Sequence, residues 1–144
     1  MSAFEFEFIP KENILEIMPL MMKINSITPE EKLRERILEM STQNYKCLGI
    51  YSDDKLIGIC GLWFLTRHYC GKTMEPDHVI IDEKYQGQGV GQQLFDWLFE
   101  FAKMEGIEAA ELNTYVQNTR SHKFYYNLGF EIKGYHFLKI LNRD

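Results

Sequence analysis

The segment that most constrains this chain is a glycine-rich loop between an apolar stretch and an amphipathic stretch. Residues 79–81 (Val-Ile-Ile) form the apolar stretch, and Gly87, Gly89 and Gly91 follow it within five positions of one another. Because glycine lacks a Cβ, such a loop lets the backbone approach a ligand closely. Apolar residues then recur at three- and four-residue spacing over 90–101, which predicts a helix ending near Gly106. The sequence therefore predicts a buried strand, a glycine loop and a long helix in direct succession.

This arrangement suits an anion. The first turn of the helix would present free N–H groups and about half a unit of positive charge. With the loop it would form a cradle for a phosphate or pyrophosphate. Spacing alone leaves open a structural role, in which the glycines only make a tight turn. Two known phosphate loops do not fit, because no Lys-Ser or Lys-Thr follows Gly91, and Gln92 stands where a dinucleotide fingerprint needs its third glycine.

The rest of the chain predicts an α/β protein with a mixed sheet. Phe4, Phe6 and Phe8 alternate with glutamates, the period of a half-buried strand. A helix is expected over 11–25, bent or broken at Pro19, and another begins with Thr28 as its N-cap. Further predicted elements are a hairpin of 47–51 with 56–64, a strand over 107–116, a helix over 119–127 and a final strand or hairpin over 130–141.

Composition limits the class of protein. The 144 residues suit a single domain over 1–144, and the formal net charge of −5 disfavours a nucleic-acid-binding module. No apolar run approaches ~18–20 residues, so we expect no membrane span. Three cysteines without Cys-x-x-Cys spacing make a disulfide framework or a zinc site unexpected. These features predict a cytoplasmic protein without a metal.

Two motifs carry a resemblance to a known family. The loop reads Gln86-x-x-Gly89-x-Gly91, and about 30 residues later the chain reads Asn118-x-x-Ser121-x-x-x-Tyr125-x-x-Leu128-Gly129-Phe130. In this order and spacing they resemble the two motifs of the GNAT superfamily of N-acetyltransferases, over roughly residues 74–131. Departures are small, since Ser121 replaces the family's usual alanine and Gln86 its commoner arginine.

The resemblance implies a GNAT fold: a mixed sheet with two splayed parallel strands, flanked by about four helices. Acetyl-CoA, the implied co-substrate, would lie between the strand ending at Ile81 and a strand over 108–115. Its pantetheine arm would pair with backbone groups of Val79 and Ile81. Asn118 would hydrogen-bond that arm, cap its own helix, or do both. The pyrophosphate would rest on the N–H groups of Gln86, Gly87, Gln88, Gly89, Val90, Gly91 and Gln92.

The resemblance also implies direct transfer of an acetyl group to a primary amine. Tyr125 matches the family's tyrosine, which implies a general acid for the departing thiol. An acidic residue before the loop often serves as the base, and we favour Asp77 over Glu75, with a chain of waters as the alternative. If the strand is regular, the two share a face, and His78 should lie on the opposite one.

The acceptor is open at this level. A small-molecule amine and a protein amine are both compatible with the sequence, and a homodimer is an open option. In this family the helices over 11–44 usually line the acceptor pocket, and their acidic residues suit a cationic amine or simply a solvated face. A non-catalytic acyl-CoA-binding module is the alternative function.

Overall fold

The computed structural model describes residues 4–142. Two compact units make up this range, a first unit extending to Glu111 and a second unit starting at Leu112. The first unit holds the sheet, three of the α-helices and the glycine loop, whereas the second holds the helix α4 (Thr119–Asn127). None of the helices within 4–142 is long and apolar enough to cross a membrane.

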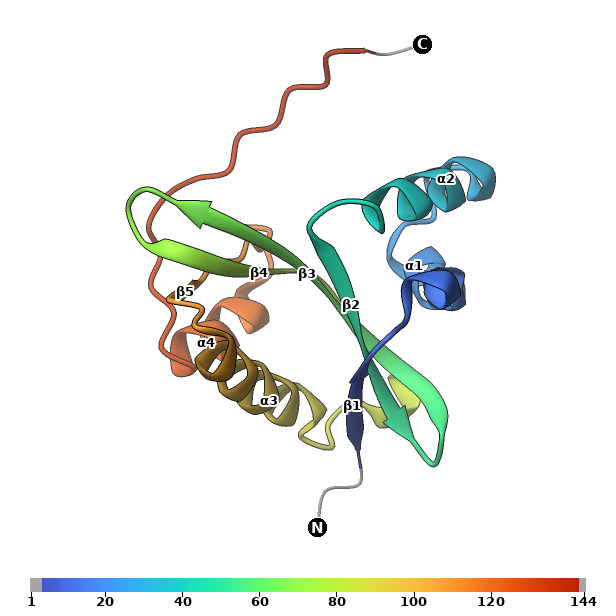
Figure 1. Cartoon of the computed structure of the whole chain (residues 1–144), viewed down its shortest axis with the longest axis horizontal. Helices are drawn as coiled ribbons and strands as arrows, with labels where there is room; N and C mark the ends of the chain where they lie inside the picture. The colour runs from blue at the N-terminus through green and yellow to red at the C-terminus, as the bar shows by residue number, and fades with distance from the viewer. Residues whose placement is uncertain (1–3, 143–144) are drawn as a thin grey trace. The chain divides into compact units, whose positions relative to one another are not determined.

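The sheet has five strands whose spatial order follows the sequence (Figure 1). Strands β1 to β4 pair antiparallel, and β4 pairs parallel with β5. The predicted mixed sheet is therefore confirmed, and the described residues contain four α-helices. The strands are β1 (Glu5–Phe8), β2 (Tyr45–Ser52), β3 (Lys55–Arg67), β4 (Gly71–Ile81) and β5 (Ala109–Ala110).

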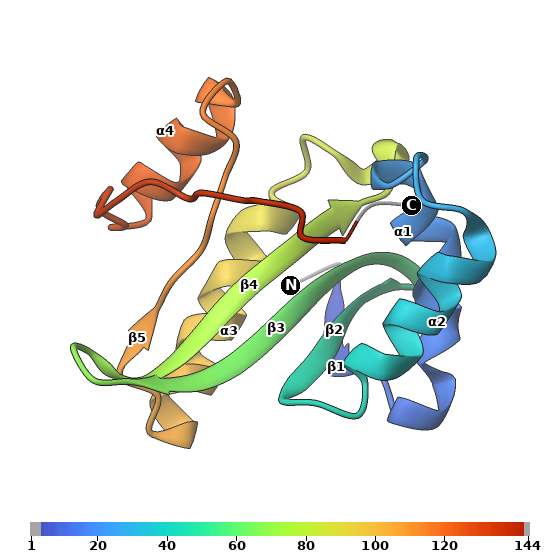
Figure 2. The same ribbon diagram turned by 90° about the horizontal axis from the view of Figure 1, so that it is seen from above.

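Helices cover both faces of this sheet (Figures 1 and 2). On one face, the 3-10 helix η1 (Lys11–Ile17), α1 (Met18–Ile24) and α2 (Glu30–Met40) share a buried apolar cluster with β2, β3 and β4. On the other face, α3 (Val90–Glu105) places Trp97 and Phe101 against Phe8 of β1, with ring centroids 5.6 and 5.1 Å from it. The apolar faces of these helices thus pack against opposite faces of one sheet.

Local sequence explains most of the element boundaries. The 3-10 helix changes to α-helix at Met18, and Pro19 lies in the first turn of α1, where its missing N–H costs nothing. The hairpin between β2 and β3 turns at Asp53 and Asp54, both at positive φ, as expected for a two-residue connection. The predicted N-cap of α2 is wrong. The N-cap is Pro29, which has an extended backbone and makes no side-chain hydrogen bond to the helix. As a result, α2 starts at Glu30, one residue later than a Thr28 cap would place it.

A β-bulge interrupts the pairing of β3 with β4. Cys60 lies opposite Val79 and Leu62 lies opposite Pro76, so β4 advances three residues where β3 advances two. The extra residue falls at Asp77 and His78, opposite Gly61. Bulges re-aim side chains, and this one changes which face of β4 its residues occupy.

The last predicted strands differ from the structure. Strand β5 contains only Ala109 and Ala110, which pair with Thr73 and Met74, rather than the expected 107–116. The backbone bonds around it run from Glu108 N–H to the Lys72 carbonyl and from Glu111 N–H to the Met74 carbonyl. Within the second unit, 130–142 forms no strand, so the predicted final strand or hairpin is wrong. Apolar content over 130–141 predicted a strand, but a strand also needs a partner to complete its hydrogen bonds.

Candidate functional site

The glycine loop joins β4 to α3 through the short 3-10 helix η2 (Glu83–Tyr85). Gly87 and Gly89 adopt left-handed backbone conformations, with φ of 79° and 77°. A Cβ at either position would meet no other atom within 4 Å, so the loop backbone borders open space. Gly89 is also the N-cap of α3, whose first free N–H groups follow it. Bare backbone next to a helix N-terminus is the chemistry that a pyrophosphate needs.

Gln86 and Gln88 fold their side chains back onto nearby backbone. The amide of Gln86 donates to the Ile81 carbonyl at 3.2 Å, and the amide of Gln88 donates to the Lys84 carbonyl at 3.2 Å. Val79 and Ile81 pair with β3 on one side. Beyond Met74, no strand within the described residues lies along the other side of β4. The Ile81 carbonyl, which is predicted to pair with the pantetheine arm, accepts the Gln86 amide in this structure.

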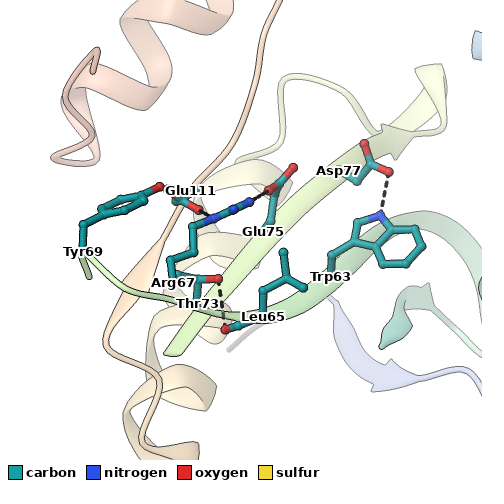
Figure 3. A network of polar contacts seen from close by, with 8 residues as sticks. All are labelled: Trp63, Leu65, Arg67, Tyr69, Thr73, Glu75, Asp77 and Glu111. Carbon is teal, nitrogen blue, oxygen red and sulfur yellow. Dashed lines mark hydrogen bonds and ion pairs between the residues drawn. The ribbon is translucent and has the colours of Figure 1, made fainter. Parts of the chain in front are cut away.

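Of the two predicted bases, Asp77 has the better defined surroundings. The indole N–H of Trp63 donates to Asp77 Oδ2 at 2.9 Å (Figure 3), and the Nδ1 atom of His78 lies 3.8 Å from the same oxygen. The nearby imidazole of His78 and then the hydrogen bond from Trp63 lower the pKa of Asp77, although partial burial opposes the shift. Asp77 is therefore a carboxylate at neutral pH with 47% of its side chain exposed.

His78 does not lie on the opposite face, as a regular strand would have required. The β4 bulge turns its ring into the core beneath α1 and α2, where Nε2 lies 2.7 Å from the Tyr45 hydroxyl. Tyr45 and His78 are 2% and 8% exposed. Since the ring is also near Asp77, the prediction of opposite faces is wrong at this point of the strand.

The other predicted base, Glu75, belongs to a four-residue polar network (Figure 3). Arg67 at the end of β3 makes ion pairs with Glu75 of β4 at 3.7 Å and with Glu111 after β5 at 2.5 Å. The Tyr69 hydroxyl also donates to Glu111. One arginine thus links three consecutive strands of the sheet at the edge where β5 ends.

Charge in this network follows from its contacts. Hydrogen bonds from Tyr69 and Arg67 lower the pKa of Glu111, with burial opposing them. Pairing with Glu111 raises the pKa of Arg67, so both groups stay ionised near neutrality. With Glu75 ionised, two carboxylates and one guanidinium leave the network with a net charge of −1, which favours a cation nearby.

Sequence reasoning missed Arg67 and Glu111. They are far apart along the chain, and neither belongs to a recognisable motif. The register of β3 with β4 and of β4 with β5 brings them together, and that register is a property of the folded sheet. The hydrogen bond from Tyr69 to Glu111 likewise had no signal in the sequence.

The remaining predicted residues lie in the second unit. The Asn118 side chain accepts the Ser121 N–H at 3.3 Å, so its capping role is confirmed. Tyr125 on α4 packs edge-on against Phe124 and Phe130, with centroids 5.4 and 5.8 Å away. Tyr126 points outward and is 74% exposed. The two neighbouring tyrosines thus have different surroundings: Tyr125 packs with Phe124 and Phe130, whereas the Tyr126 side chain is exposed.

The profile of the Acetyltransferase (GNAT) family matches residues 14–130. The chain belongs to this family. Two N-acetyltransferases are similar to this chain in sequence, at low identity. An uncharacterized N-acetyltransferase of Bacillus subtilis, YhdJ, is 22% identical over 131 residues, which cover 90% of this chain and 92% of the relative. The aminoalkylphosphonate N-acetyltransferase of Salmonella typhimurium is 30% identical over 74 residues, which cover 51% of this chain and about half (48%) of the relative.

Solved structures show the same GNAT fold. The crystal structure of a possible acetyltransferase from Clostridium difficile 630 is similar with a TM-score of 0.81 at 14% identity, covering 99% of this chain and 100% of that one. At identities this low, the likeness concerns the fold.

Proposed function

We propose that this GNAT protein is an N-acetyltransferase that moves an acetyl group from acetyl-CoA to a primary amine. The observation that carries this proposal is the loop around Gly87 and Gly89. Both glycines hold left-handed conformations, have open space where a Cβ would lie, and lead into the N-terminus of α3. Family membership supports the same role. We propose that residues 1–144 act as one acetyltransferase domain.

The proposed binding residues fit the co-substrate. The N–H groups from Gln86 to Gln92 would hold its pyrophosphate, and backbone groups of Val79 and Ile81 would hold its pantetheine arm. Asn118 would contribute a further hydrogen bond besides capping α4. When bound, acetyl-CoA supplies an activated thioester carbonyl. No metal takes part in this scheme.

The chain's own groups would manage the protons. A primary alkylammonium has an ordinary pKa near about 10.4, so the amine must lose a proton before it attacks. Asp77, or Glu75 after it, would accept that proton directly or through water. The new C–N bond forms as the C–S bond breaks, and Tyr125 would donate a proton to the departing sulfur. Acetyl amide and CoA thiol are the products, and both substrates are bound together.

A small-molecule amine is the acceptor we propose. Two solved structures similar in fold are complexes of one aminoglycoside acetyltransferase, with trehalose and with sisomicin, and the Salmonella relative is named for aminoalkylphosphonates. Asp77 and the net negative network of Arg67, Glu75 and Glu111 favour a cationic ligand. The buried thiols of Cys47 and Cys60 suit a reducing compartment, so we place the reaction in the cytoplasm.

An amine screen tests the function. Thiol release would be followed with acetyl-CoA and a panel containing an aminoalkylphosphonate, spermidine, an aminoglycoside and a lysine peptide, while calorimetry measures CoA binding. We expect turnover with at least one small amine and an intersecting pattern of initial velocities. CoA binding without turnover on any amine would instead favour an acyl-CoA-sensing module, and activity on the peptide alone would move the acceptor to proteins.

A further inference from the structure

The buried pair of Tyr45 and His78 is a polar feature of the first unit that the proposed reaction does not use. The Tyr45 hydroxyl and His78 Nε2 are 2.7 Å apart in an otherwise apolar core. Gly61 makes room for them, since a Cβ there would lie 2.3 Å from the imidazole and 2.7 Å from the hydroxyl. Burying two polar groups is costly unless they are bonded, so their pairing calls for an explanation.

The position of the other imidazole nitrogen supplies one. Nδ1 of His78 lies 3.8 Å from Asp77 Oδ2, the same oxygen that accepts the Trp63 indole N–H. Trp63 in turn packs against Tyr45, with the rings tilted and their centroids 5.0 Å apart. Tyr45, His78, Asp77 and Trp63 therefore form a closed ring of contacts around the β4 bulge, and only Asp77 extends substantially into solvent.

The chemistry of the ring selects one arrangement of protons. A neutral imidazole has one donor and one acceptor nitrogen. Burial raises the pKa of Tyr45, so its hydroxyl keeps its proton and can donate to Nε2. The remaining proton of His78 then lies on Nδ1, the nitrogen that is 3.8 Å from Asp77 Oδ2. The opposite tautomer would turn a lone pair toward that carboxylate, which is unfavourable.

We propose that His78 is a positioning residue that, with Tyr45 behind it and its proton on Nδ1, holds the Asp77 carboxylate toward the acceptor amine. This role rests on the proposed function for its use in catalysis, whereas the coupling of His78 to Asp77 can be measured without any substrate. Asp77 itself would touch the amine, and His78 would act only through it.

Other titratable groups near the pair do not confuse the measurement. Cys47 on β2 interacts with the Tyr45 hydroxyl through its side chain as well as electrostatically. Cys60 on β3 interacts electrostatically with both Tyr45 and Asp77. Burial raises the pKa of Cys47 to about 12 and raises that of Cys60 further above its ordinary value. Both thiols therefore stay neutral through the range in which Asp77 titrates.

Two substitutions distinguish the contribution of the Nδ1 atom of His78 from that of its Nε2 atom. His78→Asn keeps an amide near the position of Nδ1 and loses the group facing Tyr45, whereas His78→Gln keeps a group near Nε2 and loses the donor facing Asp77. Carbon-13 NMR of labelled aspartate carboxyls, with Asp77 assigned by its loss in Asp77→Asn, would follow its pKa. We expect a rise of about 0.5 to 1 unit in His78→Gln and a smaller change in His78→Asn.

The catalytic consequence has its own readout. On the amine found in the screen, the acid limb of the kcat/KM profile should move up in His78→Gln by the same shift that NMR gives for Asp77. If NMR shows the Asp77 pKa raised in His78→Gln but the acid limb of kcat/KM does not move, the role in catalysis is overturned. The acetyltransferase function itself would stay intact. An equal Asp77 pKa in wild type and both variants would overturn the positioning itself.

Wild-type protein provides a second measurement should either variant fail to fold. Nitrogen-15 shifts of the imidazole report which nitrogen carries the proton. We expect the Nδ1-protonated tautomer in wild type, and a change of the His78 shifts in Asp77→Asn, because coupling between two sites is reciprocal. An Nε2-protonated ring, or shifts that ignore Asp77→Asn, would contradict the proposal.

Discussion

The side-chain amide of Gln86 donates a hydrogen bond to the backbone carbonyl of Ile81, 3.2 Å away. Gln86 opens the family's loop motif, where arginine is commoner, and Ile81 ends the strand proposed to pair with the pantetheine arm. A single side chain therefore connects the glycine loop to the end of β4. If the cofactor arm donates to the Ile81 carbonyl, it competes with this amide.

Removing the competing amide should favour the pantetheine arm. In Gln86→Ala, we expect CoA to gain affinity relative to 3′-phospho-ADP, which lacks the arm, by roughly 2- to 10-fold, the net value of one hydrogen bond. Calorimetry with both ligands gives the ratio. Gln88→Ala is the matched control, because its amide bonds the Lys84 carbonyl instead. A ratio that falls in Gln86→Ala would show that Gln86 contributes to holding the arm.

Gly89→Glu should abolish CoA binding, since it adds bulk and negative charge where the pyrophosphate is proposed to rest. Part of any effect would be backbone strain, because φ is 77° at this position. Gly106→Glu at the other end of α3 controls for strain, with φ of 71° and similarly open surroundings. We expect calorimetry to show CoA binding in Gly106→Glu and none in Gly89→Glu. Unchanged affinity in Gly89→Glu would defeat the loop assignment.

Tyr125→Phe should lower kcat with little change in CoA affinity, because the substitution removes the proposed acid and keeps the ring. A loss of about 10²- to 10⁴-fold is typical for a general acid. Steady-state kinetics and calorimetry separate the two effects, and Tyr126→Phe serves as the control on the exposed side of α4. Full activity in Tyr125→Phe would mean that water or another group protonates the thiolate.

Arg67→Met should lower the free energy of unfolding modestly at pH 7, because it removes the ion pairs that Arg67 makes with Glu75 and Glu111. The pKa of Glu111 is lowered in the folded state, so its pairing stabilises fully above the ordinary value of 4.5 and is lost as the pH falls through the lowered one. Urea denaturation at pH 7 and near pH 3 should therefore show a smaller difference from wild type in acid. Arg34→Met, which loses only a pair with Glu30 within α2, is the control.

Much of the fold could be predicted from local sequence. The hydrophobic period and Gly106 placed α3, and Asn118 placed the start of α4, because each is a property of neighbouring residues. Thr28 was wrongly predicted as a cap, since Thr28-Pro29 allows two starts that differ by one residue. The short β5 and the absence of a strand over 130–142 depend on pairing partners, which local patterns do not encode.

The candidate site divides in the same way. The glycine loop is contiguous, so its residues were readable from spacing. Asp77 and Glu75 were found as neighbours on a strand, but the turn of His78 onto the face of Tyr45 required the bulge opposite Gly61. Arg67 and Glu111 meet only through the register of three strands, and for that reason no local pattern marked them.

Because β2, β3 and β4 follow one another in both sequence and space, their hairpins can form from nearby segments of chain. Pairing Thr73 with Ala109 must wait until α3 has crossed the sheet, a longer loop to close. We therefore expect the β4–β5 edge to assemble late and to open first. A ligand that binds only when β4 and β5 are paired would protect the backbone amides of that edge from hydrogen exchange more than those of β2 and β3.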